Sequence, residues 1–180
     1  MTELWHVSDD DSIGLFVPRA DPGHDSPEAL VWAIDGQHVP AYWFPRDCPR
    51  GTFWAVETTS ANDLDRFLGG ERARRVHALE WGWLDTFLEG RVFGYRLPLE
   101  TFAPYGRAAG YWVSREPVEP LEVRVLDDLP ALHRDAGIEL RVVSDLRALW
   151  DRVAASTLEF SGIRLRNLSR GQSPGPGRNV

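Results

Sequence analysis

The sequence predicts an α+β fold: a single domain built around a mixed or mostly antiparallel sheet of about seven or eight strands with short helices. Strand-like and short helix-like segments alternate along the chain, without the long regular helices of a doubly wound α/β fold. The length of 180 residues suits one domain. We expect this domain to cover residues 2–168, and the Gly-, Pro- and Ser-rich segment 169–180 to be a disordered tail.

The first half of the chain alternates strands with capped helices. Four apolar or alternating runs predict strands at 4–7, 30–34, 52–57 and 75–81. Ser8, Asp35 and Ser60 are residue types that cap helix N-termini. With these caps we expect helical segments at 13–16, 37–44, 60–68 and 83–88.

The second half repeats this organisation. Strands are expected at 91–97, 108–114, 121–126 and 138–143. Asp127 and Asp128 open a helix that reaches about Ala136. A last amphipathic helix follows Ser144 and Asp145, and its apolar face is formed by Leu146, Leu149, Trp150 and Val153.

Composition narrows the choice of partners and compartments. The formal net charge is −7, whereas proteins that bind nucleic acids or anionic membranes are normally basic. We therefore expect neither as a partner. The chain has one cysteine, a non-basic N-terminus and no apolar run of membrane-spanning length. These features favour a bacterial cytoplasmic protein, and the oligomeric state stays open.

Several catalytic classes are excluded by missing residues. All twenty basic residues are arginines, so a P-loop lysine, a Schiff-base lysine and the protein-kinase lysine are absent. The five histidines show no metal-binding spacing, and we expect no metal site. Neither the G-x-S-x-G motif of hydrolases nor the G-x-G-x-x-G motif of dinucleotide-binding folds occurs.

The segment WHVSDDD places a histidine inside a predicted strand. Because residues alternate between the two faces of a strand, His6 faces opposite to Trp5 and Val7. One interpretation is a half-buried histidine bonded to the backbone. The other is a histidine at the mouth of a cleft that binds a ligand hydroxyl through its two ring nitrogens.

The segment LVWAIDGQHVPAYWF carries an apolar strand into a helix with two large aromatic side chains. Tyr42 and Trp43 either pack in the core or form the wall of a pocket for a planar ligand. A later strand, AGYWVSREP, combines Gly110 with aromatic and polar side chains. It is either an ordinary strand or a further part of a binding site.

The pattern L-x-H-x-S in the first strand, followed by V-W-A-x-D-x(6)-Y, resembles the ADP-ribosyltransferase superfamily over residues 4–43. The resemblance implies a split sheet with an NAD cleft, with NAD as substrate. It implies that His6 bonds the NAD ribose and that Tyr42 walls the nicotinamide. Glu116 is the candidate for the late-strand carboxylate that stabilises an oxocarbenium-like centre. Further cofactor-binding residues under this interpretation are Ser8, Trp32, Arg46, Arg50 and Tyr111.

A broader resemblance spans most of residues 4–168. The segments His6-Val7-Ser8, Val31 to Asp35, Pro45 to Arg50 and Ala109 to Ser114 are similar to an uncharacterised bacterial family. This resemblance implies a shared fold, with no activity attached to it.

The loop PRDCPR admits three interpretations. Arg46 and Arg50 suit a diphosphate clamp, because guanidinium groups bind phosphate oxygens in pairs. Alternatively, the nearby cations lower the pKa of Cys48 and make a reactive thiol. The third interpretation is a structural turn with Arg–Asp pairing.

Three functions therefore remain. The first is an NAD-binding, ADP-ribosyltransferase-like protein acting at the nicotinamide N-glycosidic bond of NAD, with an unknown acceptor. The second is a non-catalytic module that binds a protein or a small anionic ligand through the Arg-flanked loop and an aromatic surface. The third is a thiol-dependent enzyme that uses Cys48.

Overall fold

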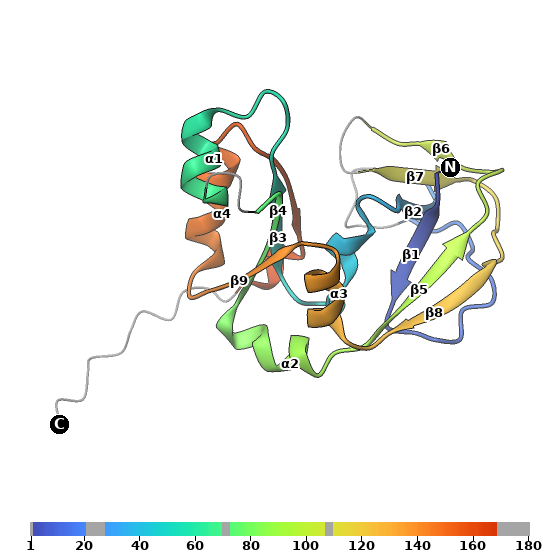
Figure 1. Cartoon of the computed structure of the whole chain (residues 1–180). Helices are drawn as coiled ribbons and strands as arrows, with labels where there is room; N and C mark the ends of the chain where they lie inside the picture. Colours follow the sequence, from blue (N-terminus) through green and yellow to red (C-terminus); the bar gives the residue numbers. More distant parts are fainter. Residues whose placement is uncertain (1, 21–27, 70–72, 107–109, 169–180) are drawn as a thin grey trace. The chain divides into compact units, whose positions relative to one another are not determined.

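The computed structural model describes residues 2–20, 28–69, 73–106 and 110–168. The chain forms two compact units (Figure 1): the first comprises Met1–Arg46 and Asp85–Ala136, and the second Asp47–Leu84 and Gly137–Val180. The tail predicted at 169–180 lies outside the described residues. The predicted α+β class with mixed, mostly antiparallel strands is confirmed.

The first unit is built on a six-stranded antiparallel sheet with the order β6-β7-β2-β1-β5-β8. Its strands are β1 (Leu4–Ser8), β2 (Val31–Asp35), β5 (Val92–Leu97), β6 (Ala103–Pro104), β7 (Tyr111–Ser114) and β8 (Glu122–Leu126). The 3-10 helix η1 (Val39–Tyr42) and the helices α2 (Leu84–Leu88) and α3 (Leu129–Asp135) complete it. The first residue of α2, Leu84, is assigned to the second unit.

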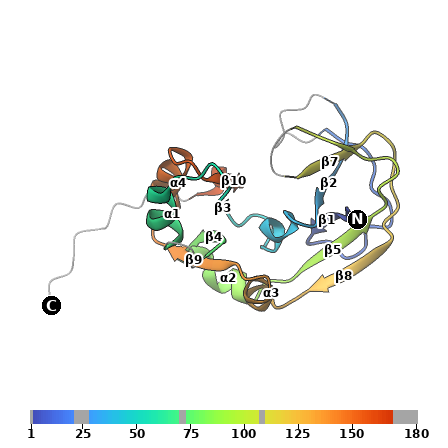
Figure 2. The ribbon, with the colours of Figure 1, turned by 45° about the horizontal axis from the view of Figure 1, so that its top comes forward.

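The second unit holds a four-stranded sheet with the order β10-β3-β4-β9, in which β4 and β9 are parallel. Its elements are β3 (Arg50–Trp54), α1 (Ala61–Leu68), β4 (Arg75–Glu80), the 3-10 helix η2 (Trp81–Trp83), β9 (Glu139–Val143), α4 (Leu146–Ala154), β10 (Glu159–Ile163) and the 3-10 helix η3 (Leu165–Asn167). Helices α1 and α4 lie side by side in both views (Figure 1, Figure 2). Their apolar faces share one core with β3 and β4.

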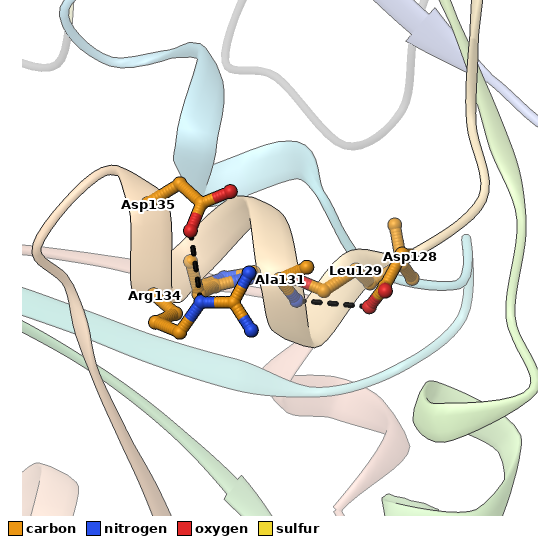
Figure 3. A network of polar contacts seen from close by, with 6 residues as sticks. Asp128, Leu129, Ala131, Arg134 and Asp135 are labelled. Carbon is orange, nitrogen blue, oxygen red and sulfur yellow. Dashed lines mark hydrogen bonds and ion pairs between the residues drawn. The ribbon is translucent and has the colours of Figure 1, made fainter.

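Capping residues fix the ends of the regular helices as the sequence predicts. The Ser60 hydroxyl accepts a hydrogen bond from the Asp63 backbone N–H at 3.2 Å, and Gly69 ends α1 in the left-handed conformation. Asp128 caps α3 by accepting from the Ala131 N–H at 2.9 Å (Figure 3). At the other end of α3, Arg134 donates to Asp135 (Figure 3).

Two helices expected in the first unit are wrong or shortened. No helix forms at 13–16: the Asp10 carboxylate accepts from the Ser12 N–H, which favours a turn, and Phe16 instead makes a two-bond antiparallel bridge with Val118. The helix expected at 37–44 is reduced to η1, because Pro40 lacks an N–H.

Ten strands are present among the described residues, more than the seven or eight expected. The two extra strands are β6, which has two residues, and β10, whose sequence EFSGI does not alternate regularly between apolar and polar residues. They exist because β7 and β3 provide partners for them.

An aromatic box encloses His133 of α3. Its ring contacts the rings of Trp43, Phe44 and Phe87 edge-on, with centroids 5.0–5.8 Å away. Its Nδ1 donates to the Leu129 carbonyl at 2.7 Å, because a carbonyl can only accept. Burial lowers the pKa of His133 to about 4, and the hydrogen bond to Leu129 opposes this shift.

We expect His133 to make the stability of the protein sensitive to acid. The folded-state pKa of about 4 lies below the ordinary value of 6.5, so the unfolded chain binds the proton first as the pH falls. Stability therefore decreases below pH 6.5, by up to about 3 kcal/mol once the pH is below 4. Unfolding in urea at several pH values between 7.5 and 4 measures this loss.

His133→Leu is the matched variant, since it keeps an apolar side chain in the box and removes the titrating group. Carboxylates titrate equally in both proteins, so the variant should show a flatter decline of stability with acid. Parallel pH profiles of the two proteins would show that His133 does not carry the effect.

Candidate functional site

The candidate site lies where β1 separates from β2 in the first unit. Strand β1 pairs with β5 over five residue pairs, but with β2 over two, Leu4 with Asp35 and Trp5 with Ile34. Just beyond this point the Nδ1 of His6 lies 2.9 Å from the Trp32 carbonyl oxygen. The imidazole thus binds a backbone acceptor of β2 at the point where the ladder stops.

This hydrogen bond determines the chemistry of the half-buried His6 ring. Because a carbonyl only accepts, Nδ1 carries the proton in the neutral ring, and Nε2 is left as an acceptor. Burial lowers the pKa of His6, while the hydrogen bond to Trp32 opposes this. Among the described residues Nε2 has no hydrogen-bond partner. A neutral ring with an acceptor nitrogen is suited to a ligand hydroxyl.

Two guanidinium groups act on this imidazole. The charges of Arg19 and Arg46 further lower the pKa of His6, so both lie within electrostatic reach of it. Both side chains are exposed. Among the described residues, the two charged groups that shift the pKa of His6 are therefore both positive, although the whole chain is acidic. Positive potential beside a neutral acceptor favours an anionic ligand that also carries hydroxyl groups.

Four aromatic side chains form what we call the aromatic cluster: Trp32, Tyr42, Tyr105 and Tyr111. The Trp32 ring contacts Tyr105 and Tyr111 edge-on, with centroids 4.8 and 5.9 Å apart. The hydroxyl groups of Tyr42 and Tyr111 are 2.8 Å apart and share a hydrogen bond. Tyr105 is on the exposed side of the cluster. Such rings can hold a flat ligand by stacking.

His6 and the aromatic cluster use opposite faces of the sheet. Residues alternate along β1, and His6 lies on the side of Phe16, whose ring centroid is 4.8 Å away. Trp5 and Val7 lie on the other side, in the core that includes Tyr42 and Tyr111. His6 and Trp32 are joined by the hydrogen bond between their strands, so the two groups meet at the line where β1 and β2 separate.

Two predicted site residues lie apart from this arrangement. Ser8 is buried, and its hydroxyl accepts from the Asp10 N–H at 3.2 Å, so it closes a turn. Glu116 is exposed just after β7, where its backbone N–H and carbonyl both bond the Ser114 hydroxyl. No contact of its side chain with His6 or Tyr42 occurs within the described residues.

The PRDCPR loop is divided between the units. Arg46 ends the first segment of unit one, whereas Arg50 begins β3 in unit two. Arg50 is buried and donates from Nη1 to the Cys48 carbonyl at 3.0 Å. These contacts favour the structural turn for the second half of the loop.

Of the three interpretations of this loop, the reactive thiol is contradicted by the structure. Cys48 is fully buried, and burial raises its pKa to about 12. Arg50 acts in the expected direction, but its effect is smaller than that of desolvation, and Glu80 adds to the rise. Cys48 is therefore a protonated core residue, and the thiol-dependent mechanism has no nucleophile.

A family model matches residues 5–168 of the chain, nearly all of the described fold. The chain belongs to DUF6886, a family of unknown function. This agrees with the predicted membership of an uncharacterised family over residues 4–168. Neither the curated proteins nor the solved structures contain a match. In this DUF6886 protein, no described helix is long and apolar enough to cross a bilayer, and the described part holds no group of ligands for a metal ion.

Sequence reasoning missed Arg19 and Tyr105. Arg19 is the one basic residue among the first 35, which was the available signal. Tyr105 joins the cluster because its backbone N–H bonds the carbonyl of Tyr111, six residues further along the chain, at 2.8 Å.

An aspartate–histidine pair was also missed. The Asp35 carboxylate lies 2.7 Å from Nδ1 of His38 and 2.9 Å from its backbone N–H, which closes the turn after β2. Gly110 packs against this pair with φ +65°, and a Cβ at that position would collide with His38 Nδ1 and Asp35 Oδ2. Gly110 is thus required for the turn that leads into η1 and Tyr42.

We predict that Gly110→Ala destabilises this protein more than Gly106→Ala. Both glycines have positive φ, +65° and +74°, so alanine costs about 1–2 kcal/mol at either position. At Gly106 a Cβ meets nothing within 4 Å, whereas at Gly110 it meets the Asp35–His38 pair. Thermal unfolding measures both, and equal losses would contradict the steric argument.

We also predict that Cys48 resists thiol reagents in the folded protein. With a pKa of about 12 against an ordinary 9.0, its thiolate fraction at pH 8 is about a thousandfold lower. Labelling by a maleimide should be undetectable on the native protein and complete in denaturant, as mass spectrometry can show. Rapid labelling of the native protein would restore the reactive-thiol interpretation.

Proposed function

We propose that the first unit binds NAD or a closely related dinucleotide and acts at its nicotinamide N-glycosidic bond, as an ADP-ribosyltransferase-like protein. The observation that carries the proposal is the hydrogen bond of 2.9 Å between His6 Nδ1 and the Trp32 carbonyl, which leaves Nε2 as an acceptor for a ribose hydroxyl. Burial, Arg19 and Arg46 lower the pKa of His6, which favours the neutral ring.

A dinucleotide matches the three kinds of group that the site offers. Its ribose hydroxyls can donate to Nε2 of His6. Its diphosphate carries the negative charge that Arg19 and Arg46 attract. Its flat rings can stack on the aromatic cluster. A single phosphate or a single sugar satisfies only part of this set.

The separation of β1 and β2 supports the placement of the ligand. His6 and the aromatic cluster lie on opposite faces of the sheet, so in this proposal one ligand contacts both groups where β1 and β2 stop pairing. The hydrogen bond from His6 to the Trp32 carbonyl joins the two strands at that position.

Glu116 is the proposed carboxylate for the chemical step. In that step the bond between ribose C1′ and the nicotinamide nitrogen breaks, and nicotinamide leaves with the electron pair. A nucleophilic oxygen or nitrogen of the acceptor then bonds to C1′ and loses its proton. The carboxylate stabilises the positive charge that develops on the ribose. Glu116 is exposed two residues after the end of β7, the strand that pairs with β2.

We predict that His6→Asn separates binding from folding. An asparagine amide can still donate to the Trp32 carbonyl, but it has no atom at the position of Nε2. The melting temperature of the free protein should change little, whereas the affinity for NAD should fall about tenfold, the effect of ~1.4 kcal/mol. Calorimetric titration with NAD, ADP-ribose and nicotinamide measures this.

Titration at different pH values adds a second readout of the same site. Because the pKa of His6 is lowered below 6.5, Nε2 is an acceptor in nearly all molecules well above that pH, and the NAD affinity should vary little between pH 7.5 and 8.5. No binding by the wild type would overturn the proposal. Equal binding by His6→Asn would remove His6 from it.

The proposed role of Glu116 in catalysis is tested by a variant of this residue and a matched control variant. Glu116→Gln should abolish release of nicotinamide while NAD still binds, and Glu119→Gln should leave both unchanged. Glu119 is the control because it is also exposed and lies three residues further along the same segment. Equal turnover by both variants would show that Glu116 is not the carboxylate.

A further inference from the structure

Strand β8 forms one edge of the six-stranded sheet, beside β5 (Figure 1). Two large apolar side chains of this strand are exposed, Val123 by 50% and Val125 by 56%, and so is Leu121 by 55%, directly before the strand. An apolar edge strand is a template for pairing with another strand, and proteins normally protect such edges. This edge therefore needs an explanation.

The two faces of β8 differ in character. Val123 lies opposite Tyr95 and Val125 opposite Phe93, so the apolar side chains share the face of those rings. Glu122 and Arg124 point to the other face, where Glu122 forms ion pairs with Arg124 at 2.6 Å and with Arg96 of β5 at 3.4 Å. The Arg124 guanidinium also lies over the Trp5 ring, 4.8 Å from its centre.

We propose that β8 pairs with β8 of a second copy of this chain, antiparallel and centred on Val123, to form a continuous sheet through a two-fold dimer. The sequence Leu121-Glu122-Val123-Arg124-Val125 is self-complementary in that register. Val123 meets its own copy on the axis, and Leu121 meets Val125 of the second copy. Glu122 meets the opposite charge of Arg124, twice.

The symmetric arrangement of charged and apolar residues about Val123 identifies a second copy of the chain as the partner of β8. In an antiparallel pair, residues at equal distances on either side of the centre face each other. The acidic and basic residues of β8 lie at equal distances from Val123, as do Leu121 and Val125. Each copy therefore supplies the complement of the other, which is the defining property of an isologous two-fold interface. A shift by one residue would place apolar side chains on the charged face.

The dimer is independent of the proposed function. Strand β5 lies between β8 and β1, which carries His6, and no residue of the proposed NAD site belongs to β8 itself. Loss of dimerisation and loss of NAD binding are thus separate outcomes.

The first test is the solution mass of the full chain as a function of concentration, by light scattering and analytical ultracentrifugation. We expect a dimer that dissociates on dilution. Val123→Lys places two ammonium groups on the axis and should weaken the dimer at least about tenfold. Leu99→Lys is the control, because Leu99 is 40% exposed in the same unit but lies outside β8. A monomer at every concentration would overturn the proposal.

Charge reversal tests the register. Glu122→Arg alone and Arg124→Glu alone each place like charges opposite each other, and both should weaken the dimer. Because Arg96 of β5 also faces residue 122, the variants are compared in an Arg96→Gln background. There the double variant restores two opposite pairs between the copies and should recover the dimer. Weakening without recovery in variants that circular dichroism shows to be folded would overturn the register.

Cross-linking gives a second, geometric test. Directly opposite residues in an antiparallel pair have Cβ atoms about 4.5–5.5 Å apart, so Val123→Cys should form a disulfide between copies under oxidised glutathione. Val125→Cys, equally exposed, would face Leu121 and lie about 13 Å from its own copy, so it should not cross-link. The native Cys48 is buried and does not interfere. Equal cross-linking of both variants would contradict the pairing.

Discussion

The hydrogen bond between His6 and the Trp32 carbonyl is the constraint on which the first unit depends. Strands β1 and β2 are the central strands of their sheet, and the Trp32 carbonyl of β2, if left without a partner, would cost free energy comparable to a lost hydrogen bond. The imidazole supplies the missing donor where β1 and β2 stop pairing. The separation of the strands is thus stabilised, and a side chain with an acceptor nitrogen is fixed at that position.

A comparison of His6 with His133 shows how the surroundings of a histidine decide which role its side chain has. Both rings donate from Nδ1 to a backbone carbonyl, and burial lowers both pKa values. His133 is fully enclosed by aromatic rings and serves packing, at the cost of acid sensitivity. His6 is half-buried beside two guanidinium groups and keeps an acceptor for a ligand. A histidine that bonds the backbone can serve function only through the ring atom that this bond leaves available.

The sheet of the first unit thus has two features of different kind, one at β1 and β2 and the other at β8, with β5 between β1 and β8. At β1 and β2 an internal pairing is interrupted, which supports ligand binding. At β8 the outer edge is continuous and apolar, which supports pairing with a further strand. In both cases the deciding property is where backbone pairing ends. For a member of a family of unknown function, this directs experiments to two well-separated groups of residues.

The sequence by itself determined the capped helices α1, α3 and α4 and eight of the ten strands. The caps at Ser60, Asp128 and Asp145 act within three residues of the helices they start, and the alternating strands were readable for the same reason. It also indicated His6, Trp32, Tyr42 and Tyr111, which the fold joins by contacts. Only the tertiary structure decided the strand order, the burial of Cys48 and Arg50, and the opposite faces of His6 and Tyr42. Those properties depend on which distant segments meet, and pairing partners far along the chain leave no mark in a local pattern.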